Sequence, residues 1–196
     1  GGKTDFSGTI IFNNEEYNVN PRNSFGYYDK NWGRDFSSPY FHLSSSNFTS
    51  EISGRLLDAS VFAVQGEYKN KVSVLVSIEG KNIEFHANKL KKNQISYDCQ
   101  EMNGTEDEGL KLHWSVSVHD RRYVIDIDIF CNTKEMSLRD FESPAGGRKV
   151  MRILASGSGT GKFKLYKKMK KNLELLEQAD ISKCICEYGN LETAEK

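Results

Sequence analysis

The sequence has no run of about 18 apolar residues, so no segment has the composition of a membrane-spanning helix. It also lacks an excess of either charge, because 27 Lys and Arg are balanced by 27 Asp and Glu. Without net charge, no overall field draws the chain to nucleic acid or to an anionic membrane, and we expect no nucleic-acid partner. The polar start, GGKTDFSG, lacks the basic and apolar regions of a signal peptide. It is typical of an expression remnant or of a cut inside a longer chain.

Cysteines are few, and their spacing matches neither a zinc pattern nor a C-x-x-C redox pair. They are Cys99, Cys131, Cys184 and Cys186. This pattern favours reduced thiols in a cytoplasmic protein. The four histidines stand on separate predicted strands or turns, with no H-x-H or H-E-x-x-H arrangement. We therefore expect no metal site and no cofactor.

The motifs of two common enzyme classes are also absent. The Gly-rich stretch 153–168 fails the P-loop pattern, because Ser156 and Phe163 stand where Gly and Ser or Thr are needed; we expect a turn between strands there. No G-x-S-x-G elbow is present, and the serines at 44–46 have no defined base. The acidic loop NGTEDEG at 103–109 lacks the alternating ligands of an EF-hand and predicts a solvated hairpin tip.

What the sequence contains is a succession of short β-strand patterns separated by turn residues. We expect strands over 4–12 and 17–20 around an Asn13-Asn14 turn, then over 39–48, 59–68, 72–80, 82–88, 94–102, 110–118, 121–131 and 136–141. The ambiguous tail 167–179 favours a strand pair that ends at Cys184–Tyr188. The 196 residues therefore indicate one all-β domain, an antiparallel barrel or closed sandwich with little helix.

Two carboxylates stand among apolar residues of the stretch 121–131. Asp126 and Asp128 share one face of this expected strand, and isoleucines occupy the other. If the Asp face looks into a barrel, its carboxyls are acid candidates, since a dry site raises the pKa of a carboxyl group. If it looks outward, they are ordinary residues on the solvent side of an antiparallel sheet.

The stretch 25–36, FGYYDKNWGRDF, interleaves aromatic and charged residues without a clean period. This mixture suits an apolar cavity with a few aimed polar groups. The alternative is a strand with a bulge at Gly33 whose rings pack sideways. His42 beside Phe41 and His113 beside Trp114 could line a cavity or be ordinary, partly exposed strand histidines.

Residues 26–33, GYYDKNWG, resemble the Y-x-(D/E)-K-N-W-G motif of the tocopherol cyclase family, and more distantly that of carotenoid hydratases. The upstream hairpin SGTIIFNNEEYNV and the C-E-Y-G segment at 186–189 are similar in placement. The resemblance implies a lipocalin-like barrel that forms the C-terminal half of a two-barrel protein. Its partner would be the N-terminal half of the same protein, and peripheral membrane contact is compatible with it.

The family chemistry implies an isoprenoid or quinol ligand and a proton-initiated ring closure. By this resemblance, Asp29 is the proton donor and Asn31 orients either this acid or the phenol. The rings of Tyr28 and Trp32 shelter the carbocation. The substrate site would further include Tyr27, His42 and Trp114. The alternatives are a non-catalytic lipid carrier of the lipocalin-like type and an interaction domain with an aromatic patch.

Overall fold

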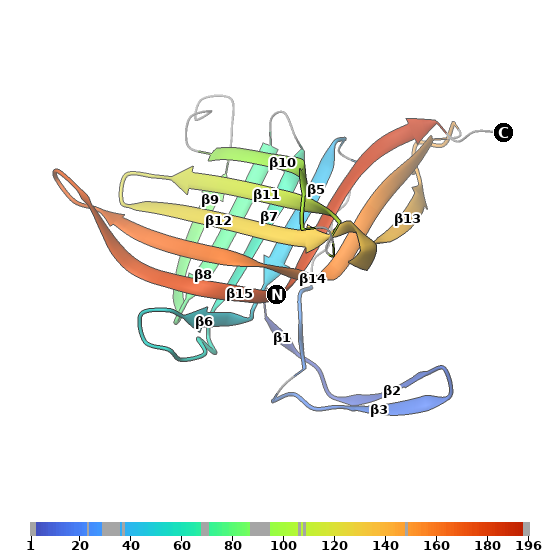
Figure 1. The fold of residues 1–196 in the computed structure, drawn as a ribbon, viewed down its shortest axis with the longest axis horizontal. Helices are drawn as coiled ribbons and strands as arrows, with labels where there is room; N and C mark the ends of the chain where they lie inside the picture. Colours follow the sequence, from blue (N-terminus) through green and yellow to red (C-terminus); the bar gives the residue numbers. More distant parts are fainter. Residues whose placement is uncertain are drawn as a thin grey trace.

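The structure, a computed structural model, is a strongly curled antiparallel β-sheet with a small N-terminal hairpin beside it (Figure 1). It describes residues 3–22, 24–28, 36, 38–67, 71–86, 95–105, 107, 109–147 and 149–193. Asp29, Asn31 and Trp32, and the alternative of a bulge at Gly33, lie outside this set. The predicted all-β fold is confirmed: the described residues form antiparallel strands that curl into a half-barrel.

Eleven strands of the described residues form the main sheet, in the order β10-β11-β12-β14-β15-β5-β7-β8-β9, with β13 on β14 and β6 on β15. Their bounds are β5 Tyr40–Ser45, β6 Phe48–Ser50, β7 Val61–Glu67, β8 Lys71–Ile78, β9 Lys81–His86, β10 Ile95–Asn103, β11 Leu110–His119, β12 Tyr123–Asn132, β13 Ser137–Glu142, β14 Lys149–Lys168 and β15 Leu173–Thr193. The short 3-10 turn η2, Thr133–Glu135, links β12 to β13.

The core lies inside the curl and follows from the alternation along each strand. In β12, Ile125, Ile127 and Ile129 are all fully buried, whereas the residues between them face outward. The neighbouring strand β11 pairs with β12 and places Trp114 opposite Ile129 in the antiparallel register. One continuous apolar cluster fills the inner face, and it includes the edge-on rings of Phe48, Phe62 and Phe163.

The expected turn within 153–168 is wrong. Residues 149–168 form the single strand β14, which pairs with β13 in its first half, with β12 in its second half and with β15 throughout. Shifts of register at Ser156, Gly159 and Gly161 show that the glycines form β-bulges. The bulges bend β14 where its pairing changes from β13 to β12. The glycines therefore allow the strand to curve and its neighbours to approach closely. The tail is strand rather than helix, as predicted, but Leu173–Thr193 form the single strand β15 instead of a strand pair that ends at Cys184–Tyr188.

The N-terminal part forms two small sheets of its own. Strands β2 (Gly8–Phe12) and β3 (Glu15–Val19) make a hairpin, and Asn13 and Asn14 take the predicted turn with φ of 50° and 62°. Strands β1 (Thr4–Asp5) and β4 (Phe25–Gly26) pair beside it and lead toward the main sheet. The hairpin stands away from the curl, and its apolar side chains remain exposed (Figure 1).

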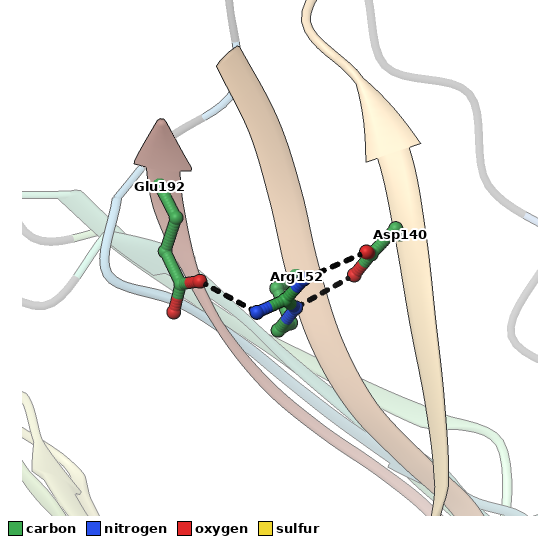
Figure 2. Close-up of polar contacts among 3 residues, drawn as sticks. All are labelled: Asp140, Arg152 and Glu192. Carbon is green, nitrogen blue, oxygen red and sulfur yellow. Dashed lines mark hydrogen bonds and ion pairs between the residues drawn. The ribbon is translucent and has the colours of Figure 1, made fainter. Parts of the chain in front are cut away.

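At one end of the long strands an ion-pair group connects three neighbours (Figure 2). Arg152 of β14 donates two hydrogen bonds to the carboxylate of Asp140 in β13, at 2.9 and 3.0 Å. It donates a third to Glu192 in β15 at 3.0 Å. These hydrogen bonds lower the pKa of Asp140. The group fixes the short strand β13 to the edge of the sheet.

Candidate functional site

Of the motif, the structure describes Gly26, Tyr27 and Tyr28, which lie at and just after the end of strand β4. Strand β4 ends at Gly26, and a backbone hydrogen bond of 3.0 Å from Phe6 to Ser24 holds the approach. A Cβ atom at Gly26 would lie 2.4 Å from the ring of Phe6, so glycine lets this ring pack directly on the chain. The next residue, Tyr27, then reaches the main sheet.

Tyr27 meets His42 of β5, with ring centroids 4.9 Å apart and planes tilted by 44°. Along β5, Phe41 and Leu43 point into the core, so Tyr40, His42 and Ser44 share the opposite face. His42 is nevertheless only 5 % exposed, and its Nε2 lies 3.1 Å from Ser44 Oγ. Tyr27 and His42 therefore lie together, at a buried polar group outside the main core.

A second polar pair lies next to this one. The Tyr40 hydroxyl donates to Glu187 Oε2 at 3.0 Å, and Glu187 of β15 stands opposite His42 in the antiparallel register. Residues opposite each other project to the same side of a sheet. A phenol, a carboxylate, an imidazole and a hydroxyl thus gather on one face, where groups of these kinds can accept, donate or orient a proton.

The polar groups adjoin an apolar floor on the same face. Met151, Ile153 and Ala155 of β14 are buried in a small cluster of their own, against which Tyr40 packs. Between Ile153 and Tyr40 stands Gly189, whose Cβ would lie 2.7 Å from Ile153 Cγ1. Only glycine allows the three strands this close packing.

A hollow of about 220 Å³ opens where the motif segment meets β5 and β15. Its lining residues come from both sides: Ser24, Phe25, Gly26, Tyr27, Ser44, Ser45, Ser46, Asn47, Lys183 and Ile185. Lys183 has a positive φ of 50°. Around it the alternation of β15 is interrupted, so Ile181 and Cys184 both point into the core although regular alternation would place them on opposite faces. The hollow is smaller than a complete drug-sized pocket, so it suits one ring or headgroup of a larger ligand.

Two further predicted site residues, Trp114 and Tyr28, are among the residues that the structure describes. Trp114 is 1 % exposed inside the main core, so the sheet separates it from the Tyr27–His42 contact. Tyr28 is 64 % exposed. The described structure therefore brings together two of the predicted residues and places Trp114 in the packing of the barrel.

Asp126 and Asp128 face outward, on the solvent side of the antiparallel sheet, and not into the barrel. Ser117 Oγ donates to Asp126 Oδ1 at 2.6 Å, and Asp128 Oδ1 lies 3.0 Å from Nε2 of His113. The His113 ring stacks on Phe130 at 4.2 Å. These carboxylates thus belong to a hydrogen-bonded ladder on the outer face and line no apolar cavity.

Three thiols gather inside the curl, from β12 and β15. Hydrogen bonding between the Cys131 and Cys186 thiols lowers the pKa of Cys131 to about 7, and the Cys186 thiol also lies within hydrogen-bond distance of the Ser156 carbonyl oxygen, at 3.7 Å. The hydrogen bond between the two thiols, together with burial, raises the pKa of Cys186. Burial, with a smaller contribution from the neighbouring Cys131, raises the pKa of Cys184 strongly. All are free thiols, and no three His, Cys, Asp or Glu side chains in the described ranges could hold a metal ion.

Sequence reasoning missed Tyr40, Ser44 and Glu187. The stretch PYFHLSSS alternates, which could have placed Tyr40, His42 and Ser44 on one face, but no local signal pairs β5 with β15 some 145 residues later. Ser44 was expected to have no base, whereas His42 lies beside it.

No helix among the described residues is long and apolar enough to cross a bilayer.

The geometry defines a half-barrel of antiparallel strands with a polar cluster and a small hollow on its outer face. Comparison with protein-family models, with curated proteins and with solved structures gives no match. The functional argument therefore rests on the residues of the site.

Proposed function

We propose that the protein binds a prenylated quinol or related isoprenoid lipid and closes a ring on it, as a tocopherol cyclase-like isomerase. The contact between Tyr27 of the motif and the buried His42, 4.9 Å between ring centroids, is the observation that supports the proposal. It joins the motif to a face that combines a polar cluster with an apolar floor. Small-molecule sites commonly have this composition.

The proposed reaction adds one proton to the substrate and removes another from it. Asp29 protonates the prenyl double bond, the phenol oxygen attacks the resulting carbocation, and the phenol loses its proton. Substrate and product are isomers, so no co-reactant is consumed. The rings of Tyr28 and Trp32 stabilise the cation through cation–π attraction, by about 0.5–2 kcal/mol each. His42, hydrogen-bonded to Ser44, is placed to accept the phenol proton.

A non-catalytic lipid carrier is the second candidate. The observation that favours it is Tyr28, which is 64 % exposed, although a carbocation requires a site closed to water. A carrier would use the same hollow and floor but would release its ligand unchanged.

The N-terminal half implied by the family resemblance is the proposed partner. The β2–β3 hairpin supports this, because Ile10, Ile11 and Phe12 are 57 %, 72 % and 63 % exposed on an isolated two-stranded sheet. Such a hairpin is marginally stable in water and gains from being covered.

The test is to incubate the protein with a prenylated quinol and separate substrate from chromanol product by chromatography. Asp29→Asn should lower turnover at least about 100-fold, the usual contribution of a positioned acid, while ligand affinity changes little. The control is Asp58→Asn, an exposed carboxylate of the described surface, which should keep full turnover. Unchanged turnover in Asp29→Asn would refute the acid role.

The same experiment separates the two candidates. Saturable binding without product in the unmodified protein would identify a carrier. Absence of both binding and product would refute the isoprenoid function in either form. His42→Gln should slow turnover and alter its pH profile, because an amide cannot accept the phenol proton.

A further inference from the structure

Although the chain has no net charge, a group of six cations lies at one end of the curled sheet. The β11–β12 turn carries Arg121 and Arg122, the end of β14 carries Lys167 and Lys168, and the β14–β15 turn that follows carries Lys170 and Lys171. Against these six cations, the same two segments contain only the carboxylates Asp120 and Glu174. Both turns lie at the same end of the molecule in Figure 1, and the β14–β15 tip projects farthest.

Hydrogen bonds and strand register hold the two turns together as one surface, here called the basic tip. The backbone N–H of Lys168 donates to the carbonyl of Arg122 at 2.7 Å, and Tyr123 stands opposite Lys167 in the register of β12 and β14. A third turn adds another cation, because Lys81 Nζ lies 4.5 Å over the ring of Tyr123. The backbones that carry these cations are therefore held side by side at one end of the sheet.

Five of the six cations are exposed toward an outside partner: Arg121, Arg122, Lys167, Lys170 and Lys171. Lys168 is half-buried. Among the described residues, the ion pairs involve cations outside the basic tip, such as Lys162 with Asp180 and Arg152 with Asp140. The nearby Asp120 carboxylate instead accepts from the backbone N–H groups of Arg122 and Tyr123, at 2.6 Å each.

Apolar side chains stand among these cations at the outermost turn. Met169 lies between the two lysine pairs and is 48 % exposed, and a hydrogen bond of 2.9 Å from its N–H to Asn172 closes the turn. Leu173 and Leu175 follow at 50 % and 42 % exposure. Cations that flank projecting apolar groups suit an anionic membrane surface, where the charges meet headgroups and the apolar groups enter the interface.

We propose that the basic tip docks the protein onto membranes that contain anionic lipids, with Met169 inserted at the interface. Nucleic acid is a weaker match to this surface, because a polyanion in water offers Met169, Leu173 and Leu175 no apolar environment. The proposal goes beyond the proposed function and does not depend on it, because binding is measured on vesicles without any isoprenoid.

The test is flotation of the full chain with vesicles of pure phosphatidylcholine or of phosphatidylcholine with about one-third phosphatidylserine. Only the anionic vesicles should carry the protein, and added salt should release it. Lys170→Gln with Lys171→Gln should weaken binding about 25-fold, about fivefold for each cation removed near an anionic surface. The matched control, Arg139→Gln with Lys149→Gln, removes two exposed cations at the other end of β14 and should bind like the unmodified protein.

A second variant separates a membrane from a general polyanion. Met169→Ser should weaken vesicle binding several-fold and leave its salt dependence unchanged. Equal binding to both kinds of vesicle, or an equal loss in the control variant, would overturn the proposal. So would full vesicle binding by Met169→Ser, particularly with tight binding to a DNA oligonucleotide, which would indicate a polyanion site.

Discussion

At the scale of single residues, Gly161 shows how closely β14 and β12 approach each other. A Cβ atom there would lie 1.8 Å from the carbonyl oxygen of Asp128 and 2.8 Å from its carbonyl carbon. Backbone atoms cannot move aside as a flexible side chain can, so any larger residue must separate the two strands.

We therefore predict that Gly161→Ala lowers the free energy of unfolding by about 2–3 kcal/mol, in the upper part of the overpacking range. Gly157→Ala is the matched control, because it lies in the same strand and its Cβ would meet nothing within 4 Å. Urea unfolding of both variants measures the difference. Equal stabilities for the two variants would show that β12 and β14 are not packed in this register.

The buried thiols give the folded state a defined dependence on alkaline pH. Burial raises the pKa of Cys184 far above its usual range, and burial with the charges of Asp98 and Glu101 raises that of Cys99 to about 12. In the unfolded chain each thiol titrates near its ordinary pKa of about 8.5. Above that pH the unfolded state releases a proton that the folded state keeps, so stability falls as the pH rises.

We predict that the free energy of unfolding, measured under reducing conditions, declines from about pH 9 upward by as much as about 1.4 kcal/mol per pH unit for a fully buried thiol. Cys184→Ala should make this decline shallower, whatever it does to stability at pH 7. Val116→Ala, a core substitution without a titrating group, should lower the curve and keep its slope. A slope that Cys184→Ala leaves unchanged would contradict the assignment.

At the scale of elements, the long strand β14 shows where local sequence misleads. The run from Ser156 to Gly161 has the composition of a turn, and only its pairing with β12, β13 and β15 identifies it as a bulged strand. By contrast, the alternation in 123–132 and the Asn13-Asn14 turn are local signals, and both predicted the observed geometry.

The short edge strand β13 is expected to depend on Arg152. We predict that Asp140→Asn, which removes the bidentate acceptor, accelerates hydrogen exchange of β13 amides and leaves β11 and β12 unchanged. Global stability should change little, because the pair is solvent-exposed. Arg139→Gln, an exposed neighbour in β13, is the control and should leave the exchange rates unaltered. Equal exchange in both variants would show that strand pairing alone holds β13.

At the scale of the whole molecule, the sequence predicted the all-β class. It named Tyr27 and His42 only as separate site residues, by resemblance to a family, and the structure shows the two rings in contact. The sequence could not predict that the outer face of the curl carries this contact, because that depends on pairing β5 with β15 across most of the chain. For the same reason Trp114, beside a histidine in the sequence, lies in the core. Net charge was also a poor guide, since its zero value conceals the basic tip.

The central claim is that the motif forms a binding site for an isoprenoid ligand, and the two tryptophans allow a direct measurement. Trp114 is buried, and its Nε1–H has no hydrogen-bond partner among the described residues, so Trp114→Phe loses packing but no hydrogen bond. We expect that change to cost on the order of 1–2 kcal/mol and to leave the fold intact. Trp32 of the motif then remains as the sole tryptophan.

Titration of Trp114→Phe with a prenylated quinol, followed by tryptophan fluorescence, is the most direct test. The account predicts a saturable change in Trp32 emission, and a quinol without the prenyl chain should produce a much smaller one. A folded variant whose Trp32 emission stays constant at all ligand concentrations would contradict the claim.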